Sequence, residues 1–301
     1  MPNTPQARPV PARPIIDMRS RPSFLHPFFG AAPGTPEEGV VRWLGRRVGT
    51  HAPDIDHFTR GRTIEGFVAE MDTAGIAAAV MVARSVPGVR VTNDDLAAAS
   101  RHDPARLIPI ASVDPIELGR DAAVAEARRA VTTLGMKGIN LDAGFYAQGM
   151  RADDDRLMPL YELCQELGVP AFVMSGPTTP DLRLNDPLAV DRVAKTFPKL
   201  PLICCHGFYP HVDAMVTVAF RNENVYVSPD MYVFAPGGKL YIEAANGFMQ
   251  DQFLFGSSFP FRPMVQGVHD FQALGLSPDA LDAALWRNAN RLLGLGLTAA
   301  S

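Results

Sequence analysis

Short apolar runs alternate with longer amphipathic stretches along most of the chain. The apolar runs predict strands at residues 14–19, 76–85, 107–114, 136–142, 171–176, 202–207, 225–230 and 253–258. The stretches between them, such as "TIEGFVAEMDTAG" at 63–75 and "DPLAVDRVAKTF" at 186–197, have the spacing of amphipathic helices. Strands buried on both faces that alternate with helices predict a parallel sheet with right-handed crossovers.

Eight such units in one chain predict a distorted α/β fold of the (β/α)8 TIM-barrel type over residues 14–296. A doubly wound sheet is the alternative, but no "GxGxxG" follows the first predicted strand. Residues 1–13 are rich in proline and predict a disordered tail. Residues 22–62 separate the first strand from its helix, and this long insertion predicts either a lid over a site or an oligomer contact.

The charge and composition of the chain argue against several classes of function. The chain has 301 residues and a formal net charge of −4, which gives no electrostatic case for nucleic acid or an anionic membrane as partner. No apolar run approaches the ~18 residues that a membrane-spanning helix needs. The three cysteines, Cys164, Cys204 and Cys205, lie in apolar surroundings and predict buried thiols. We therefore expect a cytoplasmic protein.

The stretch "PIIDMRSRP" at 14–22 carries charge into a strand that should be buried. Alternation along a strand predicts that Asp17, Arg19 and Arg21 share one face. Two guanidinium groups at a strand end are well suited to bind a substrate carboxylate with paired hydrogen bonds. Asp17 is expected to balance part of this charge, and a purely structural ion pair between Asp17 and Arg19 remains the alternative.

Further polar residues stand at the predicted strand ends, where barrel enzymes place their chemistry. His206 is the candidate general acid or base, because its ordinary pKa lies near neutrality. Asp230 is the candidate that orients His206 or activates water. The alternatives are a histidine that holds a loop and an aspartate that caps a turn. The remaining candidates for substrate binding are Asn140, Tyr209, Tyr232 and Ser258.

Six segments between Ile15 and Leu295 resemble the amidohydrolase-related family, in chain order: "IIDMRSRP", "DDRLMPLYELCQELGVPAFVMSG", "FPKLPLICCHGFYPHVDAM", "NENVYVSPDMY", "FLFGSSFPF" and "NANRLLGL". The resemblance implies a distorted (β/α)8 barrel like that of metal-dependent hydrolases. It also implies an activity among the decarboxylases of aromatic acids, hydratases and lactone hydrolases of that family.

The departures from the family pattern concern its metal ligands. The "D-x-H-x-H" histidines fall on Arg19 and Arg21, the histidine of the fifth strand falls on Met174, and the aspartate of "FGSD" falls on Ser258. His206 alone keeps the family residue. Guanidinium offers no lone pair and would repel a divalent cation, whereas zinc needs at least three protein ligands. The sequence therefore predicts no metal cofactor, with a divalent metal such as zinc as the second choice.

Three functions follow from these residues. The first is a metal-independent hydrolase or isomerase of a small ester, lactone or amide, whose carboxylate the arginines hold while His206 acts as acid or base. The second is a decarboxylase of a small aromatic or unsaturated acid. The third is a binding or scaffold subunit with a degenerate site. A small carboxylated substrate is the expected partner, and the sequence leaves open whether the chain forms a homo-oligomer.

Overall fold

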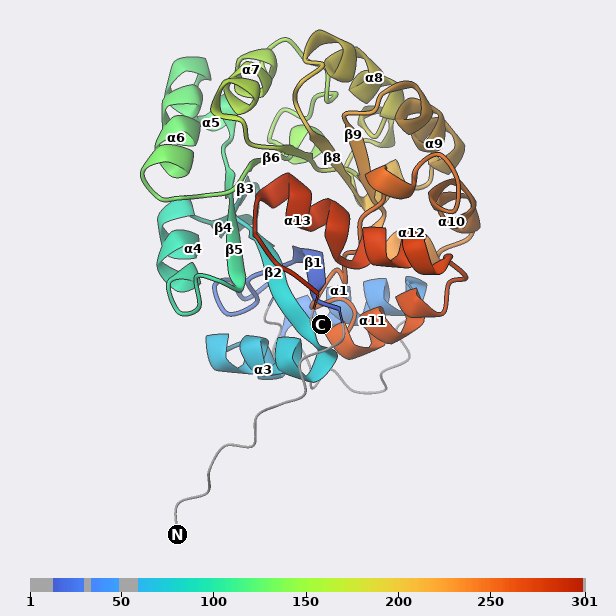
Figure 1. The fold of residues 1–301 in the computed structure, drawn as a ribbon. Coiled ribbons are helices and arrows are strands. Elements are labelled where there is room, and N and C mark those ends of the chain that lie inside the picture. Colours follow the sequence, from blue (N-terminus) through green and yellow to red (C-terminus); the bar gives the residue numbers. More distant parts are fainter. Residues whose placement is uncertain (1–12, 30–33, 49–58, 300–301) are drawn as a thin grey trace.

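Seven parallel strands form the wall of a nearly closed barrel in the computed structural model, which describes residues 13–29, 34–48 and 59–299 (Figure 1). Neighbouring strands in the sheet follow one another along the chain, as successive right-handed crossovers require. In spatial order they are β1 (Ile15–Ser20), β2 (Ile76–Val82), β5 (Leu107–Ser112), β6 (Ile139–Leu141), β7 (Ala171–Val173), β8 (Leu202–Cys205) and β9 (Val225–Ser228).

The eighth predicted strand, at 253–258, does not form a regular strand. Its residues nevertheless fill the gap between the edge strands: Leu254 donates its amide to Val227 of β9, and Phe255 accepts from Met18 of β1, both at 3.0 Å. A side chain at Gly256 would clash with Asp230, so glycine allows the backbone to pass this close to the site. The barrel is therefore closed by an irregular segment, and the predicted fold class is confirmed.

Helices cover the outside of the barrel (Figure 1). Local sequence signals explain their ends. In α3, for example, Thr63 caps the first turn by accepting from the Gly66 amide, and Gly75 ends the helix with a φ of 71°. The α-helices of the described residues are α1 (Pro36–Arg47), α3 (Ile64–Ala74), α4 (Asn93–Ser100), α5 (Pro115–Leu118), α6 (Arg120–Thr132), α7 (Met158–Leu167), α8 (Pro187–Thr196), α9 (Val212–Arg221), α10 (Lys239–Ala245), α11 (Met264–Gln272), α12 (Pro278–Asp282) and α13 (Asn288–Leu293).

The core has two main layers. One lies between the sheet and the surrounding helices. The other fills the barrel interior and includes Ile16, Val80, Ile108, Phe172 and Ile203. Ala289 and Leu293 of α13 belong to this interior cluster, so α13 seals one end of the barrel and leaves the other end for a site (Figure 1). The three cysteines are buried and free, as predicted.

Two additions rise at the end of the barrel where the strands finish. The first is the antiparallel hairpin of β3 (Arg84–Val86) and β4 (Val89–Val91). The second is α1, which lies inside the predicted 22–62 insertion. The proline-rich residues 1–12 and parts of the insertion, residues 30–33 and 49–58, lie outside the described residues. Among the helices that the structure describes, none has the length and apolar character needed to cross a membrane.

Candidate active site

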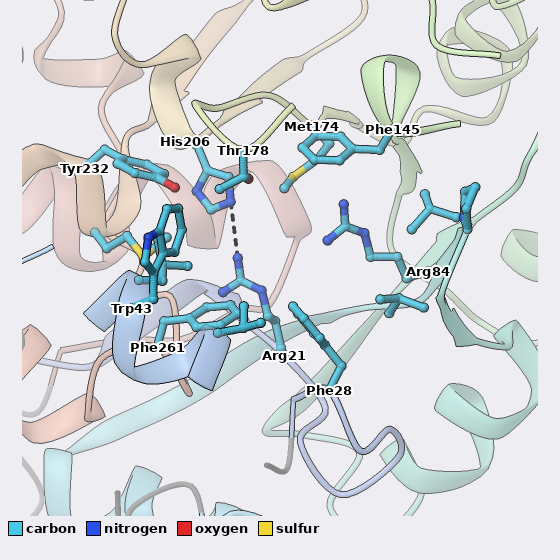
Figure 2. A pocket seen from close by; sticks show the side chains of 16 residues that line it. Arg21, Phe28, Trp43, Arg84, Phe145, Met174, Thr178, His206, Tyr232 and Phe261 are labelled. Carbon is cyan, nitrogen blue, oxygen red and sulfur yellow. Dashed lines mark hydrogen bonds between the residues drawn. The ribbon is translucent and has the colours of Figure 1, made fainter. Parts of the chain in front are cut away.

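A cavity of about 220 Å³ opens where the strands end (Figure 2). Loops after β1, β2, β7 and β8 contribute to it, together with α1 and the β3–β4 hairpin. This placement is the one that barrel enzymes use for catalysis. The lining residues are Arg21, Phe28, Val40, Trp43, Leu44, Arg84, Val86, Pro87, Val89, Phe145, Met174, Thr178, His206, Met231, Tyr232 and Phe261.

His206 lies between a carboxylate and a guanidinium. Its Nδ1 is 2.8 Å from Asp230 Oδ2, although their relative direction falls outside hydrogen-bond geometry. Its Nε2 is 3.2 Å from Arg21 Nη2. Because guanidinium can only donate, Nε2 must accept, and we infer that the neutral ring carries its proton on Nδ1, facing Asp230.

Burial controls the charge of this histidine. It lowers the pKa of His206 to about 4, and Arg19 and Arg21 add to the lowering, while Asp230 opposes it. His206 is therefore neutral at neutral pH and presents a lone pair to the cavity. Burial raises the pKa of Asp230, but contact with His206 and the charge of Arg19 outweigh it, so the net pKa lies below the ordinary value. Asp230 is an anion beside a neutral ring.

Arg21 is a buried cation at the floor of the cavity. Its Nη1 donates to the Ser258 carbonyl at 3.0 Å, and its Cζ lies 4.6 Å from the centre of the Phe261 ring. No carboxylate of the described residues forms an ion pair with it, and its buried Nε has no hydrogen-bond partner there. Burial, followed by the charges of Arg19 and Arg84, lowers the pKa of Arg21 to about 9, which leaves it protonated at neutral pH.

Arg19 lies beneath the cavity and does not line it. Its Nη2 is 2.8 Å from Met174 Sδ, and its Nη1 is 3.9 Å from Cys205 Sγ. The Asp17 carboxylate accepts instead from the Arg19 backbone amide and from Ser20 and Ser257. The alternative of an ion pair between Asp17 and Arg19 is therefore wrong for the described residues, because nearby hydroxyl and amide donors hold this carboxylate.

The other predicted site residues lie at different distances from the cavity. Tyr232 lines it and stacks on Tyr209, which lies behind it with ring centres 5.3 Å apart. Asn140 is buried and donates to Asp142 at 2.9 Å. The Ser258 hydroxyl accepts from the Met231 amide at 3.3 Å. Asp230, Asn140, Tyr209 and Ser258 are thus behind the lining, and their roles, like that of His206, stay predictions.

Backbone strain is concentrated at the same strand ends. Within the described part of the chain, the non-glycine residues with left-handed φ are His206 (59°), Phe208 (56°), Asp230 (54°) and Ser258 (60°). Such conformations cost free energy, and they gather at functional sites, where the surrounding structure enforces them. The strain supports a functional role for this region independently of its charges.

Arg84 is one of the polar residues at the predicted strand ends, and Phe28 and Trp43 lie in the insertion predicted as a lid or an oligomer contact, but none of the three was assigned a role in substrate binding. Arg84 lies at the end of the second predicted strand, at 76–85, so its position was a usable signal. Phe28 and Trp43 belong to the insertion, whose path across the barrel mouth is not encoded in any short motif. Figure 2 shows the Arg21 and Arg84 guanidinium groups turned toward the same cavity from different walls.

Three comparisons relate the chain to known proteins. The Amidohydrolase family model matches residues 58–295. A TIM-barrel protein from Bordetella bronchiseptica is 34% identical, with a TM-score of 0.84 over 93% of this chain and 98% of that one. The 2-amino-3-carboxymuconate-6-semialdehyde decarboxylase of Dictyostelium discoideum is 32% identical over 81 residues, which span 27% of this chain and about a fifth (21%) of that relative.

A more distant structure bears on the cofactor. The dihydroxybenzoic acid decarboxylase from Polaromonas sp. JS666, solved with bound manganese and the inhibitor 2-nitroresorcinol, covers 95% of this chain and 98% of its own at 18% identity and a TM-score of 0.67. Its manganese contradicts our expectation that the fold operates here without a metal cofactor. That expectation is withdrawn.

The donor set of the described residues does not match a metal centre of this kind. No group of three or more His, Cys, Asp or Glu side chains that could hold an ion is found among them. His206 Nε2 faces the Arg21 guanidinium, and the hydrogen-bond partners of the Arg19 guanidinium among the described residues are the sulfur atoms of Cys205 and Met174. Residues 49–58, outside this part, contain His51 and His57. Because the described residues offer no such group of ligands, the reaction steps below are not routed through a metal.

The fold, the strand-end cavity and the family match all support the same family assignment. The model match covers most of the barrel, and the Bordetella bronchiseptica relative aligns over nearly the whole of both chains. The chain belongs to the amidohydrolase family and is an enzyme of that superfamily.

Proposed function

We propose that the cavity decarboxylates a small aromatic or unsaturated acid that carries a hydroxyl group next to the departing carboxylate. The decarboxylases among the relatives favour this function over the hydrolase or isomerase that we predicted first. The observation that carries it is the placement of Arg21 Nη2 against His206 Nε2, which puts a fixed cation beside a proton acceptor.

The arginine is most useful where negative charge grows. A guanidinium that clamps the departing carboxylate stabilises the ground state, because that charge has gone once CO2 forms. A guanidinium beside a phenol or enol oxygen stabilises the charge that this oxygen gains. We therefore place the substrate hydroxyl, and not the departing carboxylate, between Arg21 and His206.

The proton can circulate through His206. Neutral Nε2 takes the proton of the substrate hydroxyl and leaves an oxyanion beside Arg21. Protonated His206, held by the Asp230 anion, then gives the proton to the carbon that bears the carboxylate. The C–C bond breaks, its electron pair returns to the ring, and CO2 departs. A solvent proton finally restores the hydroxyl, so the net change is an acid anion and one proton converted to CO2 and the neutral ring compound.

The size and walls of the cavity fit this substrate class. Its volume of about 220 Å³ is below the ~300–1,000 Å³ of typical drug-sized pockets, which favours a molecule with a single ring. Phe28, Trp43 and Val89 supply an apolar wall to the same cavity that the polar groups of Arg21, Arg84 and His206 line. An apolar wall also withholds hydration from a carboxylate placed against it, which favours its conversion to neutral CO2.

Purified protein incubated with ortho-hydroxylated benzoic acids, including 2,6-dihydroxybenzoate and 5-carboxyvanillate, tests the proposal by CO2 release. Each acid is assayed as purified, after chelator treatment and with added Mn²⁺, so that the manganese of the relatives is tested directly. The proposal predicts CO2 release from at least one acid, lost in His206→Asn. Hydrolysis of a matched lactone panel without any CO2 release would restore the hydrolase.

A further inference from the structure

Arg84 is a second guanidinium of the cavity, held in a fixed position. It is 9% exposed, its Nη2 lies 3.0 Å from Asp142 Oδ1, and its Cζ lies 5.0 Å from the centre of the Phe145 ring. Asp142 is itself fully buried and accepts from Asn140 through its other oxygen. The ion pair and the ring therefore hold the guanidinium so that it faces the cavity (Figure 2).

The Nε donors of both arginines lack partners in the part of the chain that the structure describes. The Nε atoms of Arg21 and Arg84 are buried and have no hydrogen-bond partner among the described residues. Among the described residues that line the cavity, none has a carboxylate side chain. Buried donors are rarely left unsatisfied in native proteins, so both arginines keep donor capacity for an acceptor that a ligand or a water supplies.

The two guanidinium groups serve different ends of the cavity. Arg21 lies beside His206, whereas Arg84 comes from the β3–β4 hairpin beside Phe145 and Val86. Their mutual repulsion contributes to the lowered pKa of Arg21. A substrate whose hydroxyl lies beside Arg21 leaves Arg84 facing an apolar wall, whereas a substrate that also carries a retained carboxylate at the other end satisfies both arginines.

We propose that Arg84 binds a second anionic group of the substrate, a carboxylate that stays on the product, so that the enzyme prefers dicarboxylic acids to monoacids. This inference rests on the proposed function for its account of which group departs. Arg84 is thus a specificity-determining residue: it anchors the retained carboxylate and thereby fixes where the departing group lies against the apolar wall.

Binding of benzene-1,3-dicarboxylate and benzoate, measured by isothermal titration calorimetry, tests the preference without any turnover. Wild type is expected to bind the diacid at least tenfold more tightly. The test variant is Arg84→Met/Asp142→Asn, which removes the whole ion pair, leaves the net charge unchanged and leaves no unpaired buried carboxylate. The matched control, Arg90→Met/Glu117→Gln, removes the exposed ion pair that joins the same hairpin to α5.

The double variant at Arg84 is expected to reduce the preference for the diacid to less than twofold while benzoate binding stays within threefold. The control should keep the full preference. Arg84→Lys, which keeps the charge and loses the Nε donor, should lower the affinity for the diacid at least threefold. This variant replaces the double variant as the test if the double variant does not fold. A wild-type preference below twofold, or a full preference retained in the Arg84 variants, would overturn the inference.

These outcomes are separable from the proposed function. A diacid preference that depends on Arg84, combined with no CO2 release from any acid, would leave the second anion site standing and remove the decarboxylase. CO2 release from monoacids, with no dependence of binding on Arg84, would leave the decarboxylase standing and remove the second anion site.

Discussion

Arg21 Nη2 lies 3.2 Å from His206 Nε2, so a permanent cation touches the lone pair of a neutral imidazole at the mouth of the barrel. The contact brings together the residue after β1 and the residue after β8, which are 185 positions apart in the chain. On the far side of the ring, Asp230 Oδ2 lies 2.8 Å from Nδ1. Asp230, His206 and Arg21 thus lie in a row, in which His206 can transfer a proton while Arg21 stabilises a negative charge beside it.

Replacing Arg21 should remove the stabilisation of the developing oxyanion. We expect Arg21→Gln to lower kcat/KM by about 10²–10³-fold, the effect of losing one oxyanion donor, with most of the loss in kcat. Steady-state kinetics on the acid found active will check this. Arg183→Gln, at a side chain 89% exposed, is the matched control and should match wild type. If the Arg21 substitution changed KM alone, we would conclude that the guanidinium binds a substrate group whose charge does not change in the reaction.

Asp230→Asn tests the charge behind the imidazole. Asparagine tolerates the left-handed backbone at this position (φ 54°), so the substitution removes the charge with little strain. Because the Asp230 anion raises the pKa of His206, its loss should lower that pKa further and weaken Nε2 as the base that takes the hydroxyl proton. We expect kcat to fall by about 10²-fold and the acid limb of the kcat/KM profile to move to lower pH. An unshifted profile would make Asp230 a purely structural residue.

His206 should also leave a signature in stability. Its pKa is about 4 in the folded protein and ordinarily 6.5, so between these values the unfolded chain binds a proton that the folded chain does not. The free energy of unfolding therefore falls as pH falls from 6.5 toward 4, by at most about 1.4 kcal/mol per pH unit from this residue. Denaturant unfolding at pH 7, 6 and 5 should show a flatter dependence in His206→Asn. Equal slopes would mean that the folded histidine is not held neutral.

The fold was predictable because its signals are local and repeated. Each strand is an apolar run and each helix an amphipathic one, and the irregular closing segment at 253–258 still carries the apolar pattern of a strand. The alternation of side chains between the two faces of the first strand was less informative about the site. The register between β1 and β2 shifts between Asp17 and Ser20, so counting alternate residues did not place Arg19 beneath the cavity and Arg21 within it.

The site was only partly predictable for a related reason. Strand ends identified His206 and Arg21 as candidates because (β/α)8 geometry brings those ends together. The partner of Arg84 could not be read in the same way, because Asp142 reaches it from a different strand end. Trp43 and Phe28 reach the cavity through a long insertion, whose path depends on tertiary packing and not on local pattern.

Arg262 is expected to position the helix that walls the cavity. Its side chain is buried, its Nη1 donates to the Val48 carbonyl at the end of α1 at 2.6 Å, and its Cζ lies 4.1 Å from the centre of the Phe234 ring. Because α1 supplies Trp43 to the cavity, Arg262→Met should loosen that wall and raise KM about tenfold with a smaller change in kcat.

Arg262→Lys, which can still reach the carbonyl, should recover part of the KM effect. Arg291→Met, at an exposed arginine that donates to the Asp251 carbonyl, is the control for losing such a bond elsewhere. Equal changes in kcat and KM at Arg262, with no recovery by lysine, would indicate general destabilisation in place of positioning.

The most direct test follows the carbon that loses CO2. Wild type and His206→Asn are incubated in D2O with each ortho-hydroxylated acid, with and without Mn²⁺, and the products are analysed by NMR. The account predicts that wild type releases CO2 from at least one acid and places a single deuterium on the carbon that carried the carboxylate, and that His206→Asn does not. No consumption of any acid under either condition, or an equal rate in the variant, would contradict it.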